Sequence, residues 1–324
     1  MKRPHGFVGI LALSFVASAV PTYAQGVTLR YRWTKGETLT YRVTSQTTSA
    51  VTGMPGINEM KIEQGMTQVI KITAEDVTPD GTATLRETFE SVKMEMNGPM
   101  GRVSYDTAAP SSIANPMIQA MRQVLGAMVG ASITVVQAAD GTVRKVEGAT
   151  KILEQMTKTM QEDPAAAAAA QGLKAAFSDE ALKTTLEQSF SKLPTDPVKP
   201  GDTWPAKLAM GNEMIGRIVG SVVFTLKAID GAADSGVAQI GVDLTLKQEV
   251  APPPGPNGLV MKLGDARGAG SIVFDLAKGR IQKSTMETNM PSTMTMPAPD
   301  GSTATMQNKT TTTMTMELVE KEAR

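Results

Sequence analysis

Methionine is the residue type whose spacing in this chain could support a chemistry of its own. The 324 residues include 22 methionines, and several are separated by a single residue. Three pairs have this spacing: Met94 and Met96, Met294 and Met296, and Met314 and Met316. Because side chains alternate along a strand, each pair places two thioethers on one face. Thioethers suit Cu(I), but they also fill apolar interiors adaptably. We favour an apolar interior and keep Cu(I) binding as the alternative.

Carboxylates are the other groups that could act in catalysis. The visible clusters are Glu75 and Asp76, Glu87 and Glu90, and Asp179 and Glu180. Spacing alone does not bring two carboxyl groups to the roughly 5–10 Å that glycoside hydrolysis needs. The chain has no phosphate loop, no GxSxG and no HExxH, and Gly264, Gly268 and Gly270 lie in a strand context that indicates bends. We therefore name no catalytic, cofactor-binding or metal-binding residue, and the balance is against an enzyme.

Histidine and cysteine are both absent from the chain after residue 24. The single histidine is His5, and there is no cysteine. This excludes Ser-His-Asp and Cys-His catalysis, zinc held by His or Cys, and disulfides. Without residues 1–24 the chain has 30 basic and 32 acidic residues, a net charge of −2. Near-neutral charge gives no electrostatic footprint for nucleic acid.

The first 24 residues are predicted to be a cleaved secretory signal peptide. Lys2 and Arg3 precede an uncharged apolar run over residues 7–20, which is too short to span a bilayer as a helix. Pro21 ends the run, and small residues stand at the −3 and −1 positions of a cut after Ala24. We expect an extracytoplasmic protein, periplasmic or secreted, with no transmembrane span after cleavage.

Most of the remaining chain is predicted to form long antiparallel strands. Runs rich in Thr and Val alternate polar and apolar residues, as at residues 39–44, and several exceed ten residues. Short turn sequences separate them, and Asp-Gly between alternating runs is a strong hairpin signal. The turns are Asp80-Gly81, Asp140-Gly141, Asp230-Gly231, Lys278-Gly279 and Asp300-Gly301. Residues 251–258 are Pro-rich and predict a surface loop.

Helices are expected only in the middle of the chain, over about residues 115–193. Asn115-Pro116 is an N-cap followed by proline at the first helical position. Further helices are predicted over 152–160, over the alanine-rich run 164–177, and from Ser178 to Leu193. The fold class is therefore α+β, with long curved antiparallel sheets and a mid-chain helical segment.

The helical segment separates two sheet units. We place one unit with the helices at residues 25–193 and the second at 194–324, after the Pro-rich sequence that leads to Trp204. Gly36-Glu37-Thr38 opens the first unit and Gly201-Asp202-Thr203 opens the second, each just before a strand. This suggests an internal duplication. The alternative is that Gly-acid-Thr is a common way to enter a strand.

Three short motifs in order make the chain resemble an exported bacterial family of unknown function. They are Tyr31-x-Trp33-x-x-Gly36-Glu37, the Asp-Gly-Thr hairpin that ends in Val146-Glu147-Gly148, and Leu193-Pro194 followed by Val198-x-Pro200-Gly201-Asp202-Thr203-Trp204. The resemblance implies no catalytic residues. In architecture alone, long strands curled around helices also resemble the half-barrels of periplasmic lipoprotein carriers, which bind acyl chains between sheet and helices.

These observations predict a non-catalytic exported binding module for an apolar or lipid-like ligand. The site is expected between the concave sheet and the helices, where an apolar pocket can be closed on several sides. The alternative is a structural or envelope-interaction protein with no small-molecule ligand. The oligomeric state and the ligand are left open.

Overall fold

The computed structural model describes residues 26–54, 56, 58–99, 101–109, 125–158, 178–189, 192–212, 216–253, 260–297 and 303–319. The strands are β1 (Thr38–Thr52), β2 (Met60–Val77), β3 (Ala83–Gly98), β4 (Gly101–Asp106), β5 (Ser132–Gln137), β6 (Val143–Glu147), β7 (Thr203–Asn212), β8 (Gly216–Asp230), β9 (Val237–Val250), β10 (Val260–Leu263), β11 (Ala266–Asp275), β12 (Arg280–Pro297) and β13 (Thr303–Leu318). The helices are α2 (Ala149–Lys158) and α4 (Asp179–Ser189). The protein is thus mostly antiparallel β, with a smaller helical share than α+β implies.

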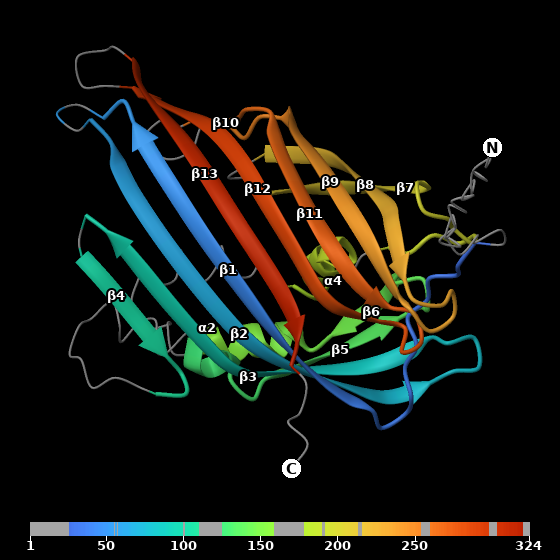
Figure 1. The fold of residues 1–324 in the computed structure, drawn as a ribbon. Coiled ribbons are helices and arrows are strands. Elements are labelled where there is room, and N and C mark those ends of the chain that lie inside the picture. Colours follow the sequence, from blue (N-terminus) through green and yellow to red (C-terminus); the bar gives the residue numbers. More distant parts are fainter. Residues whose placement is uncertain are drawn as a thin grey trace, which may run out of the picture.

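The thirteen strands form one sheet, in the order β6-β5-β3-β2-β1-β13-β12-β11-β9-β8-β7, with β4 on β3 and β10 on β12. The expectation of two sheets is therefore wrong. The two units are halves of one sheet, because β1 and β13 pair over twelve residues, from Tyr41 opposite Leu318 to Thr52 opposite Gln307 (Figure 1). Turn sequences specify hairpins between neighbours and carry no information about a pairing between the first and last strands.

Each predicted hairpin is confirmed by its strand pairing. The pairs β2–β3, β5–β6, β8–β9, β11–β12 and β12–β13 are antiparallel. The first four connections carry the predicted dipeptides, and Asp300-Gly301 lies outside the described residues. Gly81 and Gly141 have φ of 79° and 87°, a left-handed conformation that glycine adopts without a steric penalty. Of the predicted helices, α2 and α4 are present. Residues 115–124, 164–177 and 254–258, and the predicted signal peptide, lie outside the described residues.

The two halves of the sheet are entered in the same way. In each half, a Gly-acid pair precedes the first strand, and its backbone forms two hydrogen bonds with one residue of the second strand. The side chain of the acid also accepts a hydrogen bond from the backbone N–H three residues earlier. The bonds are Gly36 N to Ala74 O (2.8 Å), Ala74 N to Glu37 O (2.9 Å) and Thr34 N to Glu37 Oε2 (3.2 Å) in one half, and Gly201 N to Leu226 O (2.7 Å), Leu226 N to Asp202 O (3.0 Å) and Lys199 N to Asp202 Oδ2 (2.8 Å) in the other. This correspondence supports the duplication hypothesis.

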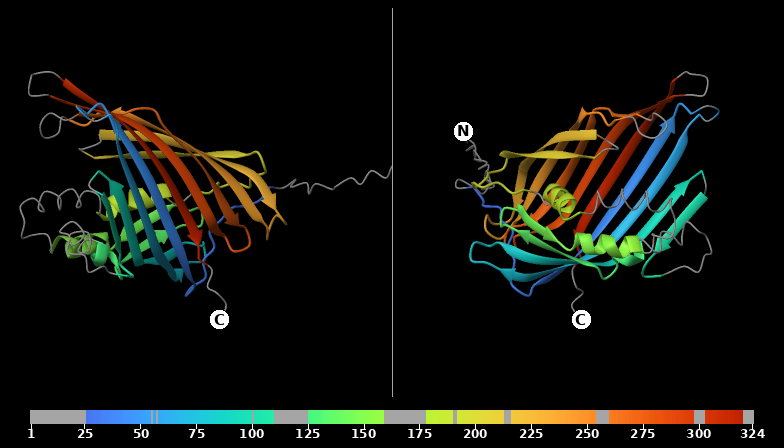
Figure 2. Two further views of the ribbon diagram at one scale, coloured as in Figure 1. Left: turned by 60° about the vertical axis from the view of Figure 1, so that its left-hand side comes forward. Right: turned by 180° about the vertical axis from the view of Figure 1, so that it is seen from behind.

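The sheet is curved (Figure 2), and buried side chains fill its concave face at one end. This packed end lies where β1 and β7 begin and where β13 ends. One buried cluster, with Leu226, Ile240 and Phe274, belongs to the C-terminal half, and another, with Leu85 and Val135, belongs to the N-terminal half. Helices α2 and α4 pack over β5 and β6.

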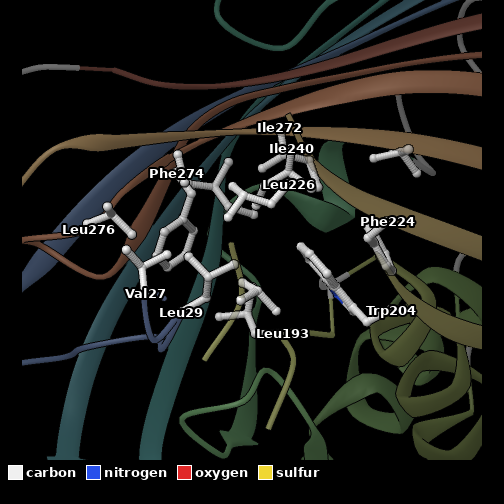
Figure 3. Close-up of a cluster of buried hydrophobic side chains, with 14 of the residues drawn as sticks. Val27, Leu29, Leu193, Trp204, Phe224, Leu226, Ile240, Ile272, Phe274 and Leu276 are labelled. Carbon is white, nitrogen blue, oxygen red and sulfur yellow. The ribbon is translucent and has the colours of Figure 1, made fainter. Parts of the chain in front are cut away.

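Residues 27–33 join the two halves at the packed end. Tyr31 N donates to Ala139 O in the β5–β6 turn, and Arg32 N donates to Gly279 O in the β11–β12 turn. Leu29 is fully buried among the side chains of the C-terminal cluster, which point toward one another in Figure 3. Trp33 packs against both clusters and donates its Nε1 hydrogen to Gln137 Oε1 at 3.1 Å. The resemblance motif Tyr31-x-Trp33 therefore has a structural role at this junction.

Candidate functional site

The long central strands have two chemically different faces beyond the packed end. On the convex face, β12 and β13 present threonines such as Thr293, Thr305 and Thr313. On the concave face, four of the alternate residues of β12 and three of those of β13 are methionine. Twelve strand methionines share the concave face by register: Met60, Met66, Met94, Met96, Met261, Met286, Met290, Met294, Met296, Met306, Met314 and Met316. Pro291 leaves the β12–β13 register intact, so Met286, Met290 and Met294 share one face.

These methionines differ from an ordinary core. None of the twelve is fully buried: eleven are half-buried, and Met314 is 45% exposed. By contrast, Leu85 and Leu226, on the same face at the packed end, have no exposed surface. The sheet methionines therefore form a partly exposed apolar surface that continues from the packed interior.

Seven of these methionines fall into two rows that run across the strands, and Met60, Met96 and Met290 lie at register positions between the rows. The proximal row, nearer the packed end, contains Met286 opposite Met314, then Ser45, and then Met66 opposite Met94. The distal row contains Met261, Met294 and Met306, which lie side by side on β10, β12 and β13. Met286 and Met294 are eight residues apart on β12, so the rows are separated by about 26 Å.

A band of small polar residues lies between the rows on the central strands. Thr47 bonds to Thr312 (3.1 Å) and Ser49 bonds to Thr310 (3.0 Å), each through its hydroxyl group. Asn308 donates to the Thr310 hydroxyl at 3.2 Å, and its own Oδ1 is buried with no partner among the described residues. The concave surface is thus apolar at both rows, with a polar band that can form hydrogen bonds between them.

Two of the methionine pairs considered for Cu(I), Met294 with Met296 and Met314 with Met316, do not come together. Met314 lies in the proximal row and Met294 in the distal row, and Met316 and Met296 flank them. Spacing along one strand cannot show which methionines are opposite each other on neighbouring strands. Met261 and Met306 have no methionine two residues away, so the sequence pattern missed them, although they are the direct neighbours of Met294.

Glu87 is an acidic residue within the apolar packed end. It lies on the concave face of β3, opposite Ile72 and Ile133, and is 5% exposed. Its Oε1 atom has no hydrogen-bond partner among the described residues. Loss of water around the carboxylate raises the pKa of Glu87 to about 7. Glu87 is therefore a carboxyl group that holds a proton under mildly acidic conditions.

The predicted carboxylate clusters do not form a catalytic pair. Glu90 is exposed and pairs with Lys71 at 3.2 Å, whereas Glu87 is buried. Glu75 pairs with Arg86, and Asp76 pairs with Lys35, all of them near the surface. Asp179 begins α4 and accepts a bond from Thr150 N. Across the described ranges, no three carboxylates gather in a group that could hold a metal ion.

Two surface hollows lie away from the strand methionines, whereas a smaller one, of about 300 Å³, has Met96 among its otherwise mostly polar lining. One, of about 690 Å³, lies along residues 192–205 beside Trp204. Another, of about 660 Å³, lies beside α2, and Glu147, Lys151 and Asp179 contribute to its wall. Both are open to solvent and rich in polar groups, unlike the apolar enclosure typical of a small-molecule site. None of the helices in the described ranges is both long and apolar enough to cross a bilayer.

Comparison with known proteins gives one family match. A family of unknown function (DUF6263) matches residues 80–281, which is more than half of the chain. No curated protein matches. Among solved structures, the chain is similar to lipovitellin, from a study of lipid–protein interactions, with 11% identity and a TM-score of 0.41. The similarity covers 90% of this chain and 26% of that one, so this chain spans about a quarter of the lipovitellin chain.

The chain is also similar to DynF from the dynemicin biosynthesis pathway of Micromonospora chersina. The identity is 10% and the TM-score is 0.19, with coverage of 97% of this chain and 92% of that chain. At these identities and scores, neither structural likeness bears on function, and the site has to be interpreted from its own residues.

Proposed function

We propose, from its own structure, that this chain, which belongs to the DUF6263 family of unknown function, is a non-catalytic binding module. Its concave methionine-lined face would hold an apolar or lipid-like ligand. The observation that carries the proposal is that all twelve of these methionines share this face and that none is fully buried.

The physical basis is the free energy of apolar surface in water. Each Å² of apolar surface removed from water contributes about 25 cal/mol, so a ligand that covers the methionines gains this contribution. Methionine side chains are flexible and polarizable, and they adapt to ligands of different shapes. The Ser/Thr band around Thr310 offers hydrogen bonds to a polar group on an otherwise apolar molecule.

Export is part of the same proposal. The predicted signal peptide, cleaved after Ala24, would place the mature chain in the periplasm or the medium. A protein that shields an apolar molecule from water is useful in such an aqueous compartment. Intact-mass measurement of secreted protein tests the cleavage: the expected product begins at Gln25, and a product that retains residues 1–24 contradicts it.

Ligand binding is tested by native mass spectrometry of protein purified from its own compartment, followed by titration with a fluorescent fatty acid. We expect a stoichiometric apolar adduct and saturable binding of the probe. Met314→Glu places a charge on the concave face and should weaken probe binding at least tenfold, because a carboxylate resists transfer from water to an apolar contact.

Thr313→Glu is the matched control, because Thr313 is the adjacent residue of β13 and points to the convex face. It should leave probe binding within twofold of the wild type. Absence of any adduct together with absence of saturable binding would contradict the proposal and favour the interaction protein without a small-molecule ligand. Equal loss in the two variants would place the ligand elsewhere.

A further inference from the structure

The distal methionine row differs from the other methionines in one respect. Met261, Met294 and Met306 are direct register neighbours on three adjacent strands, β10, β12 and β13. In the proximal row, Ser45 on β1 interrupts the corresponding run between Met314 and Met66. The distal row is therefore a place where three thioethers lie side by side on one face.

The spacing of these strands suits a single small ion. Adjacent strands are about 4.8 Å apart, so the backbones that carry Met261 and Met306 are separated by about 10 Å, with Met294 between them. A methionine side chain has three rotatable bonds, and side chains on a concave face converge. Three sulfur atoms can therefore meet above Met294 without any movement of the sheet.

The backbone of β10 is held in position by contacts within the sheet. Gln248 of β9 donates to Met261 O at 3.3 Å and accepts from Leu263 N at 3.0 Å. Gly264 N donates to Pro291 O at 2.8 Å, which extends the pairing with β12. Leu263 also packs against a small buried cluster that contains Ile218. Met261 is thus placed by β9 and β12 together.

The chemistry of the row selects a soft ion. All three side chains are half-buried and so remain partly accessible. The nearest charged residues along these strands, Lys262 and Lys309, lie opposite Thr293 and Pro291 on the convex face. Neutral thioethers without carboxylates do not attract hard cations such as Ca²⁺ or Mg²⁺, whereas they suit Cu(I).

We propose that Met261, Met294 and Met306 form a site for one monovalent soft metal ion, Cu(I), at the distal end of the concave face. The site uses three of the twelve methionines on the face proposed to hold an apolar ligand, and none of the methionines of the proximal row. Ion binding would involve no redox step, since the metal is taken up and released as Cu(I).

Anaerobic titration of the protein with Cu(I), in competition with the chelator bicinchoninate, tests the site. The wild type should bind one Cu(I) per chain, and X-ray absorption at the copper edge should show three sulfur neighbours. The triple variant Met261→Leu/Met294→Leu/Met306→Leu should bind at least tenfold more weakly. Leucine and methionine have similar volumes, so the melting temperature should change little.

The matched control is Met66→Leu/Met94→Leu/Met314→Leu, which removes three methionines from the proximal row of the same face. Its Cu(I) affinity should stay within twofold of the wild type. The proposal is overturned if the two triple variants lose binding equally, if the wild type fails to compete with the chelator, or if absorption shows oxygen and nitrogen neighbours in place of sulfur. Probe binding by the fatty acid is measured on the same variants, and its outcome does not decide the copper result.

Discussion

The two ends of the concave face are built from the same strands but have different degrees of burial. At the packed end, Leu85, Leu226 and Phe274 are at most 1% exposed and touch side chains from helices, turns and residues 27–33. Farther along β2, β3, β12 and β13, alternating positions carry methionines that are half-buried or, at Met314, 45% exposed, whereas β8, β9 and β11 carry no methionine and bury Ile218, Leu246 and Ala266 there. The sequence period is two residues at both ends. Alternation therefore specifies which face is apolar, whereas the type of apolar residue distinguishes a core from an accessible surface.

The comparison predicts the largest stability effect at the packed end. Phe274→Ala removes a ring that is 1% exposed and packs edge-on against Tyr31 at 5.7 Å between centroids. It should lower the free energy of unfolding by about 4 kcal/mol, the usual cost of a buried Phe→Ala change. Urea denaturation monitored by circular dichroism measures this. A loss below 1 kcal/mol would show that the packed end is not the stabilising core.

Glu87 gives an intermediate effect that depends on pH. Its pKa is raised to about 7 in the folded protein, against about 4.3 in an unfolded chain. The native state is therefore relatively more stable when Glu87 is protonated, and this stability is lost as the pH rises from about 4.5 through 7. Glu87→Gln should remain neutral and be more stable than the wild type by roughly 3 kcal/mol at pH 8.

At pH 4 the Glu87→Gln variant and the wild type should have nearly equal free energies of unfolding, because both side chains are then neutral. Denaturant titrations at pH 4, 6 and 8 provide the comparison. Glu90→Gln is the control, because Glu90 is exposed and pairs with Lys71, and it should show no such trend. A difference between Glu87→Gln and the wild type that does not vary with pH would rule out the buried, proton-holding carboxyl.

The smallest effect is expected in the methionine surface. Met314→Ala removes a side chain that is 45% exposed, and it should lower the free energy of unfolding by less than about 1 kcal/mol, as is usual for exposed positions. Its effect on probe binding should be larger than its effect on stability. If Met314→Ala destabilises the protein as much as Phe274→Ala, the contrast between the two ends is wrong.

Much of the fold was predictable from local sequence. Dipeptides such as Asp80-Gly81 and Asp140-Gly141 predicted the hairpins, and Thr/Val alternation predicted the long strands. The joining of the two halves into one sheet was not predictable. It depends on the pairing of β1 with β13, for example Thr44 opposite Thr315, and neither strand has a sequence pattern that identifies the other as its partner. The boundary between units at residues 193 and 194 stays a prediction.

The candidate site was predictable in kind but not in detail. Pairs such as Met294 and Met296 correctly indicated one methionine-rich face. Its two rows could not be found from single strands, because Met261, Met294 and Met306 become neighbours only through the register of β10, β12 and β13. Burial of Glu87 likewise depends on Ile72 and Ile133 from other strands.

The β1–β13 pairing also determines the order in which the strands of the sheet can pair during synthesis of the chain. As the chain is made from its N-terminus, β1, β2 and β3 can pair early, but one edge of β1 stays open until residues 303–318 have emerged. Contacts between strands this distant in sequence form slowly, and an open edge of about fifteen residues invites pairing with another copy of the chain. Newly made protein should therefore be most prone to aggregation just before its last strand is added.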